Sequence, residues 1–265
     1  MELHKDNEAF AELVGVTAEA IGLPQIYVEK DYWVTKALKH LSESEHFEAV
    51  VFKGGTSLSK AYRLIDRFSE DIDLAVFANE LGDARRKKLL RAIESDVTQG
   101  LTYLKGDARE SKHSNFRKTV YQYPHSIDGE DFGQASPELL VEINSFTNPE
   151  PFETRKLRTL IAEVLAKKDQ NDLISKYGLK GFSINVLSVK RTLIEKMLGV
   201  VKDSYDADPA SKLSDRIRHL YDICMILKHD EYREFVQSDE FKPICDLCID
   251  DEKTGFFINS ECLDM

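Results

Sequence analysis

Two short motifs in the first third of the chain constrain its fold more than any other feature. An apolar run at residues 49–52 leads into Gly54 and Gly55, and a second apolar run around residues 72–77 carries an Asp-x-Asp pattern. β-branched and aromatic residues favour strands, and paired glycines favour a tight turn. The pattern therefore predicts a strand, a glycine turn, a helix over residues 57–65 and a second strand that carries two aspartates.

The glycine turn is suited to binding phosphate. Two glycines allow the backbone to turn sharply and to approach a ligand closely. A helix that begins at Thr56 or Ser57 would present free amide groups and the positive end of its dipole to an anion. Neighbouring hydroxyl and ammonium groups would add further contacts. The candidate nucleotide-binding residues of this segment are Lys53, Gly54, Gly55, Thr56, Ser57 and Lys60.

The two aspartates are suited to binding a divalent cation. Alternate residues of a strand face the same side, so Asp71 and Asp73 share one face while Ile72 points into the core. Carboxylate oxygens suit Mg²⁺, which binds through one or two carboxylates together with substrate phosphates. Glu142 alternates with apolar neighbours in a predicted strand over residues 139–144 and is the candidate third ligand.

Each motif is common by itself, but their order is typical of nucleotidyltransferases related to DNA polymerase β. Several further segments have sequences that are similar to one family of that superfamily. The chain resembles the AbiEii/AbiGii nucleotidyltransferase toxins over most of its length. The segments that carry the resemblance are residues 28–35, 52–60, 67–74, 191–196 and 219–222.

The resemblance implies an α+β fold, with a polymerase-β-like core of a small mixed sheet and helices, followed by a mainly helical C-terminal domain. It implies the toxin of a toxin-antitoxin or phage-defence pair, whose partner is a separate antitoxin. The expected reaction is two-metal, Mg²⁺-dependent transfer of a nucleotide from a nucleoside triphosphate to the 3′ end of tRNA. By residue, the family pattern assigns metal binding to Asp71 and Asp73, triphosphate contact to Lys196, and a requirement for activity to Asp222.

The last two residues also have ordinary structural explanations. On a helix over residues 189–201, Arg191 and Glu195 would form an i,i+4 ion pair and Lys196 would be solvated. On the next helix, Asp222 would pair with Arg218, four residues earlier. The residues alone leave both interpretations open.

The predicted secondary structure changes near residue 149. Before it, strands alternate with helices, including one predicted over residues 85–97. After it, helical spacing dominates, beginning with a predicted helix over residues 154–168. We therefore expect a catalytic core with N-terminal helices over residues 1–148 and a helical domain over residues 149–265.

The net charge of the chain limits which molecules could accept the transferred nucleotide. The net charge of −11 comes from 36 Lys and Arg against 47 Asp and Glu, which excludes a general electrostatic attraction for nucleic acid. Basic residues nevertheless gather at residues 85–91 and 105–118, where they would form either ordinary solvated helix and loop faces or a local surface for RNA. Two alternatives stay open: a protein hydroxyl as the acceptor, and a regulatory module that binds nucleotide without catalysis. Retention of both aspartates argues against the second.

No apolar run approaches the roughly 18 residues that a membrane span needs, and the first ten residues are charged rather than signal-like. We expect a cytoplasmic protein with no membrane partner.

Overall fold

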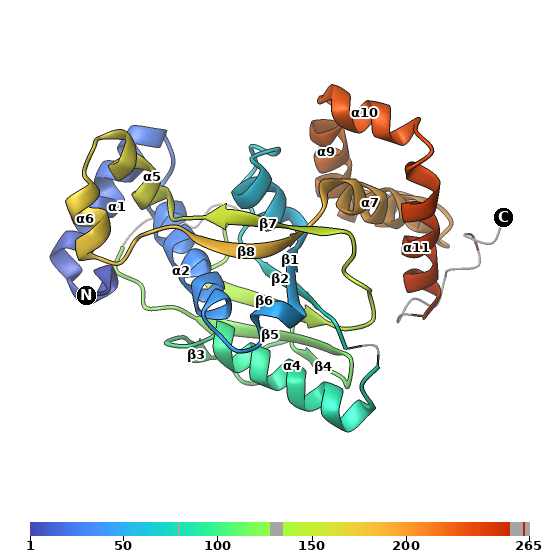
Figure 1. Cartoon of the computed structure of the whole chain (residues 1–265), viewed down its shortest axis with the longest axis horizontal. Coiled ribbons are helices and arrows are strands. Elements are labelled where there is room, and N and C mark those ends of the chain that lie inside the picture. Colours follow the sequence, from blue (N-terminus) through green and yellow to red (C-terminus); the bar gives the residue numbers. More distant parts are fainter. Residues whose placement is uncertain (79, 128–134, 255–261, 263–265) are drawn as a thin grey trace.

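The centre of the protein is a mixed sheet of eight strands within the residues that the structure describes (Figure 1). The structure is a computed structural model that describes residues 1–78, 80–127, 135–254 and 262. The strand order is β3-β5-β6-β2-β1-β8-β7, and β4 pairs with β5. The strands are β1 Val50–Lys53, β2 Ile72–Val76, β3 Thr102–Tyr103, β4 Ser111–Lys112, β5 Phe116–Gln122, β6 Glu138–Asn144, β7 Phe152–Leu157 and β8 Phe182–Leu187.

Helices lie on one face of the sheet and at both of its ends. The α-helices are α1 Asn7–Ile21, α2 Gln25–Ser42, α3 Gly54–Ser57, α4 Asp83–Val97, α5 Leu160–Lys167, α6 Asn171–Lys176, α7 Val189–Ser204, α8 Pro209–Asp215, α9 Ile217–Ile226, α10 Asp230–Val236 and α11 Phe241–Thr254. Shorter turns are η1 Leu3–Lys5, η2 Phe47–Ala49 and η3 Leu58–Tyr62, of which η3 is π-helical. No helix within the described part of the chain is long and apolar enough to cross a bilayer.

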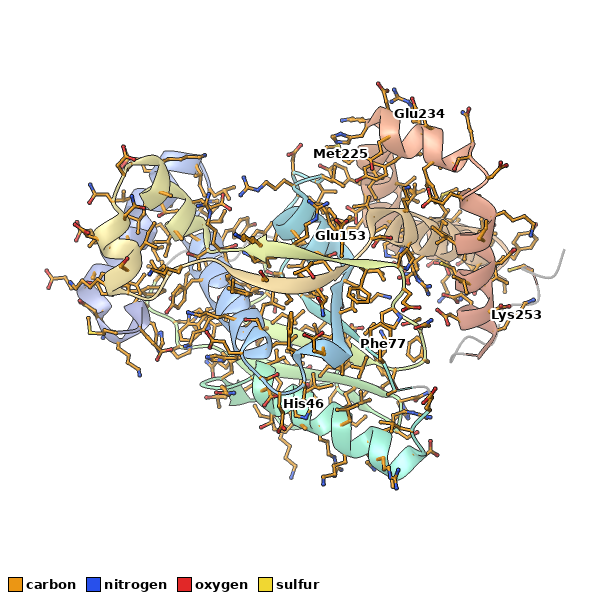
Figure 2. All side chains as sticks on the ribbon, viewed as in Figure 1. His46, Phe77, Glu153, Met225, Glu234 and Lys253 are labelled. Carbon is orange, nitrogen blue, oxygen red and sulfur yellow. The ribbon has the colours of Figure 1, made fainter. Side chains whose placement is uncertain are left out.

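The helices are divided between two hydrophobic clusters. α2 and α4 pack against each other and against the sheet, where Ile72, Leu74 and Val76 of β2 enter the larger cluster. The smaller cluster joins α7, α9, α10 and α11 to Leu58, Leu64 and Ile65. Figure 1 shows α7, α9, α10 and α11 gathered beyond the end of β8, with α1, α5 and α6 on the opposite side of the molecule. The space between the ribbons is filled by side chains (Figure 2).

The predicted mixed sheet with helices is confirmed, and most predicted elements agree with the structure. β1, β2 and β6 match the predicted strands, and α4 and α7 match predicted helices. α7 begins at Val189 because the Ser188 hydroxyl accepts a hydrogen bond from the Arg191 amide and caps the helix. The helix predicted over residues 57–65 instead begins at Gly54 and continues as the π-helical turn η3.

The expected start of the helical domain at residue 149 needs correction. A helix was predicted over residues 154–168, but only its second part is helical, as α5. Residues 152–157 form β7, which pairs with β8 in the central sheet. β7 is an edge strand whose first three residues are all exposed, so its sequence is rich in charge and lacks the apolar alternation of a half-buried strand. A division after residue 148 would cut the sheet. We propose that the helical unit begins at α7.

Candidate active site

Four charged side chains form a row across four neighbouring strands. Lys53 lies opposite Asp73, Asp73 opposite Glu142, and Glu142 opposite Lys118 in the strand register. These residues share the face of the sheet that points away from α2 and α4, because Ile72 and Leu74 occupy the other face. The row therefore places two adjacent carboxylates between two lysines, and Asp71 lies on the same face two residues before Asp73.

The two aspartates are held in an environment that disfavours their ionised forms. Burial, together with the charges of Glu142 and Asp71, raises the pKa of Asp73 to about 7, although Lys53 and Lys196 act in the opposite direction. Burial and the charge of Glu70 raise the pKa of Asp71. Glu142 has a partner, since Lys118 Nζ lies 2.6 Å from its carboxylate. The aspartates thus carry negative charge that the protein compensates incompletely.

The glycine pair permits a close approach of side chains from the segment after it. Gly54 has φ of +81°, and a Cβ placed there would lie 2.0 Å from Asp73 Oδ2. A Cβ at Gly55 would lie 2.5 Å from Arg67 Nη2. Any larger residue at Gly54 or Gly55 would displace one of these charged groups. The two glycines are therefore needed to leave space for the side chains of Asp73 and Arg67.

Lys196 is fixed by a buried carboxylate. Its Nζ lies 2.9 Å from Asp222 Oδ2, and Asp222 also accepts two hydrogen bonds from Arg67, at 2.7 and 2.8 Å. Burial opposes ionisation of Asp222, but the hydrogen bond from Arg67 and the charge of Lys196 hold its pKa below the usual range. The pairing of Asp222 with Arg218 considered from sequence is therefore wrong, and Lys196 is buried rather than solvated.

A second ion-pair network holds Lys53. Its Nζ lies 2.7 Å from Glu195, which also accepts a hydrogen bond of 3.2 Å from Arg191. Arg191 in turn pairs with Asp251 of α11 and donates to the Glu150 carbonyl at 2.7 Å. The i,i+4 pair of Arg191 and Glu195 is confirmed, and it belongs to a network that connects β1, α7 and α11.

The charged row, α7 and α11 surround a cavity of about 360 Å³. Five of the residues that the sequence predicted as site residues line it: Lys53, Gly54, Asp73, Glu142 and Lys196. Asp222 lies behind Lys196 and is fully buried. These residues come from β1, the turn after it, β2, β6 and α7, so segments distant in sequence meet at one cavity.

Three other predicted residues have partners inside the protein. Thr56 Oγ1 is 3.0 Å from the Ser69 hydroxyl, and Ser57 donates a hydrogen bond of 2.8 Å to the Gly54 carbonyl. Lys60 pairs with Asp31 of α2. None of these three residues is among the described residues that line the cavity, and the same is true of Gly55 and Asp71. A contact between nucleotide and these side chains stays a prediction.

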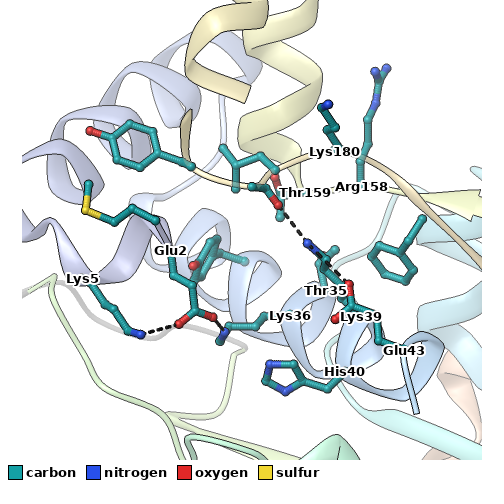
Figure 3. Close-up of a pocket in the computed structure, with 16 residues that line it drawn as sticks. Glu2, Lys5, Thr35, Lys36, Lys39, His40, Glu43, Arg158, Thr159 and Lys180 are labelled. Atoms are coloured by element: carbon teal, nitrogen blue, oxygen red, sulfur yellow. Dashed lines mark hydrogen bonds and ion pairs between the residues drawn. The ribbon is translucent and has the colours of Figure 1, made fainter. Parts of the chain in front are cut away.

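A larger cavity of about 510 Å³ lies elsewhere, between the N-terminal residues, α2 and the start of β8 (Figure 3). Figure 3 shows Lys5 and Lys36 turned toward Glu2, with which both form ion pairs. Among the described residues, none of the site residues predicted from sequence lines this cavity. Chemistry rather than size therefore selects the smaller cavity as the candidate active site.

The donor set of the smaller cavity fits a cation that binds through few protein ligands. Within the part of the chain that the structure describes, no group of three or more His, Cys, Asp or Glu side chains could hold a metal ion. Asp71 and Asp73 nevertheless offer hard oxygen donors on one face, and their raised pKa values show that added positive charge would be favourable. Mg²⁺ commonly binds with one or two carboxylates, substrate phosphates and water.

Sequence reasoning missed several residues that line the cavity or that hold its side chains in place. Arg67 was visible only as the start of the Arg-Phe-Ser-Glu-Asp run, and nothing in the sequence linked it to Asp222. Asp251, Phe116 and Phe146 carried no signal, because they reach the cavity through the fold alone. His219 lines the cavity from α9, where burial and the nearby charges of Lys196 and Arg216 lower its pKa to about 4.

Comparison with known protein families matches residues 36–244 to the family described as "Nucleotidyl transferase AbiEii toxin, Type IV TA system". The chain belongs to this family. It is accordingly a nucleotidyltransferase toxin of a type IV toxin-antitoxin system, and the family implies a nucleoside triphosphate substrate and an antitoxin partner.

Among solved structures, the AbiEii chain is similar to MenT4, a nucleotidyltransferase toxin from Mycobacterium tuberculosis H37Rv. The TM-score is 0.53 at 17% sequence identity, and the match covers 89% of this chain and 68% of MenT4. This likeness supports the fold. No match is found among curated proteins.

Proposed function

We propose that this toxin transfers a nucleotidyl group from a nucleoside triphosphate to the 3′-hydroxyl of tRNA. The observation that carries the proposal is the charged row beside the glycine turn, where Lys53, Asp73 and Glu142 line one cavity together with Lys196. In the reaction, the acceptor oxygen forms a bond to the α-phosphorus, the bond to the bridging oxygen of pyrophosphate breaks, and the hydroxyl loses its proton.

Asp71 and Asp73 are the residues that we propose as ligands of Mg²⁺, with Glu142 beside them as the candidate third carboxylate. When bound, Mg²⁺ supplies positive charge to the reacting phosphate oxygens. The aspartates orient the triphosphate relative to the sheet, since Asp73 lies on a strand that is paired on both sides and Asp71 directly precedes that strand. Rigid positioning of this kind is important in phosphoryl and nucleotidyl transfer, because the protein itself does little covalent chemistry.

Lys196 and Lys53 are proposed to bind the triphosphate. Both ammonium groups face the cavity, and both are held by carboxylates outside the charged row, Asp222 and Glu195. Cations held in place before the reaction stabilise charge that develops on the leaving pyrophosphate without further reorganisation. Arg67 contributes indirectly, because it shares Asp222 with Lys196 and packs against Gly55.

The acceptor surface that we propose is the exposed face of α4. Arg85, Lys87, Lys88 and Arg91 are all exposed there. In the other basic group most side chains have acidic partners, including Arg109 with Asp107, and Arg117 with Glu94. Exposed lysine and arginine side chains attract RNA phosphates, and this attraction falls as salt concentration rises. The face of α4 therefore suits the body of a folded RNA.

The test is a labelling experiment. Purified protein is incubated with Mg²⁺, each α-³²P-labelled nucleoside triphosphate, total cellular RNA and cell extract, beside Asp71→Ala/Asp73→Ala. Asp239→Asn is the matched control, because Asp239 is an exposed aspartate in the loop before α11. We expect label in tRNA with the native protein and the control only. Label in protein instead of RNA would overturn the proposed acceptor, and no label in either would overturn the reaction.

A further inference from the structure

Two aromatic rings, those of Phe116 and Phe146, lie next to the charged row. Phe116 precedes Lys118 by two residues on β5, so it shares the face of the row at a distance of roughly 7 Å along the strand. Phe146 follows β6, and its ring centroid lies 6.2 Å from that of Phe116 with the planes tilted by 42°. Both rings line the cavity that contains Asp73 and Glu142.

The rings are not part of the hydrophobic core. Phe116 and Phe146 are each only partly buried, and neither belongs to either hydrophobic cluster of the described residues. Aromatic side chains at a cavity wall are a common way to bind planar ligands, because a flat ring offers a large contact area with little loss of conformational freedom. Their position beside a site for charged phosphates calls for a ligand with a planar apolar end.

The same cavity is also lined from α7 and α9 by two polar atoms that lack a hydrogen-bond partner. The Thr192 hydroxyl on α7 is buried, with 3% of the residue exposed, and it makes no hydrogen bond within the protein. His219 Nδ1 is likewise buried without a partner. An unsatisfied buried hydroxyl is costly, so native proteins rarely retain one without a reason. A ligand in the cavity that offers hydroxyl groups would satisfy both atoms.

The lining of the cavity offers a partner for each part of a nucleotide. Charged side chains of the row and Lys196 line it, as do the unpartnered polar atoms of Thr192 and His219 and the two aromatic rings. A nucleoside triphosphate presents phosphates, then a sugar with hydroxyl groups, then a planar base. A volume of about 360 Å³ is within the range of small-molecule sites, which begins near 300 Å³.

We propose that Phe116 and Phe146 form the nucleobase subsite of the substrate nucleotide, and that the Thr192 hydroxyl binds its sugar. This inference rests on the proposed function, because it requires that the triphosphate lies at the charged row. Stacking on aromatic rings tolerates every base, so the two rings set the affinity for nucleotides more than the choice among them.

The experiment measures binding by calorimetry with the full chain, Mg²⁺ and two kinds of probe. The first probe is a set of α,β-methylene nucleoside triphosphates, which cannot transfer their nucleotide, and the second is inorganic triphosphate, which has no base or sugar. The variants are Phe116→Ala, Phe146→Ala, Phe146→Trp and Thr192→Val. Phe152→Ala is the matched control, since Phe152 is a partly exposed ring on the edge strand β7 and does not line the cavity.

We expect each alanine variant at Phe116 or Phe146 to weaken nucleotide binding by about 5- to 100-fold and to leave triphosphate binding unchanged. Phe146→Trp should retain nucleotide affinity, and Thr192→Val should reduce it severalfold. An unchanged nucleotide affinity, or an equal loss for both probes, would overturn the subsite. If the native protein binds neither probe, the proposed function itself fails, and this result is distinct from a failure of the aromatic subsite alone.

Discussion

Asp73→Asn is expected to remove activity and at the same time to stabilise the protein. Asparagine has nearly the same shape as aspartate, so the close contact with Gly54 is preserved while the charge is lost. The pKa of Asp73 is raised from 3.8 to about 7 by burial and by the neighbouring carboxylates. The ionised carboxylate therefore opposes folding at any pH at which the unfolded chain is already ionised.

The magnitude follows from linkage between protonation and folding. Because the folded pKa lies above the unfolded one, the destabilisation by Asp73 grows between about pH 4 and pH 7 and is complete above pH 7. A change from 3.8 to about 7 corresponds to at most about 4 kcal/mol at 1.36 kcal/mol for each factor of ten. Asp73 is only partly shielded from solvent, so we expect a smaller gain of about 1–3 kcal/mol.

The assay is thermal denaturation at pH 8 and at pH 5, without metal and with Mg²⁺. At pH 8 the midpoint of Asp73→Asn should rise by several degrees above that of the native protein, since each kcal/mol shifts it by about 2–4 °C in a protein of this size. At pH 5 the two proteins should differ less, and Mg²⁺ should stabilise the native protein more than the variant. Asp239→Asn should change neither midpoint.

One result would refute this reasoning. If Asp73→Asn lowers the midpoint equally at both pH values, then attraction to Lys53 and Lys196 exceeds the cost of burial and repulsion. The Asp73 carboxylate would then be a structural ion-pair partner rather than a ligand for a cation.

Three further predictions concern the neighbours of Asp73. Gly54→Ala should destabilise the protein by about 2–4 kcal/mol in chemical denaturation, because the new Cβ meets Asp73 Oδ2. The control is Gly22→Ala, which has a similar positive φ but no neighbouring atoms, and it should cost only about 1–2 kcal/mol. Asp222→Asn should lower the free energy of unfolding by about 3–5 kcal/mol and abolish nucleotide transfer, because it leaves Arg67 and Lys196 unpaired. The control Asp203→Asn breaks the half-exposed pair with Arg216 and should cost less than about 1 kcal/mol. Without nucleotide, Thr192→Val should raise the free energy of unfolding by about 1 kcal/mol, and a decrease would indicate that the hydroxyl already has a partner.

Local patterns in the sequence were sufficient for the elements that carry the chemistry. The glycine turn after β1 and the two aspartates at the start of β2 follow from strand alternation and turn composition, which depend on neighbours only a few residues apart. The helix of Lys196 follows from helical spacing for the same reason. The resemblance to one family added the roles expected of Lys196 and Asp222.

Tertiary structure alone decided which side chains meet. Glu142 lies beside Asp73 because β6 pairs with β2 in parallel, and Lys118 lies beside Glu142 because β5 pairs with β6. The sequence prediction contained three of the eight strands that the structure describes and missed β3, β4, β5, β7 and β8. The edge strand β7 was predicted as helix because its charged residues face solvent and lack the alternation of a half-buried strand. Strand register and ion pairs across more than a hundred residues, such as that of Arg67 with Asp222, depend on the packing of the whole chain. Local composition therefore determined where the reactive groups lie along the chain, and long-range packing determined that they share one cavity.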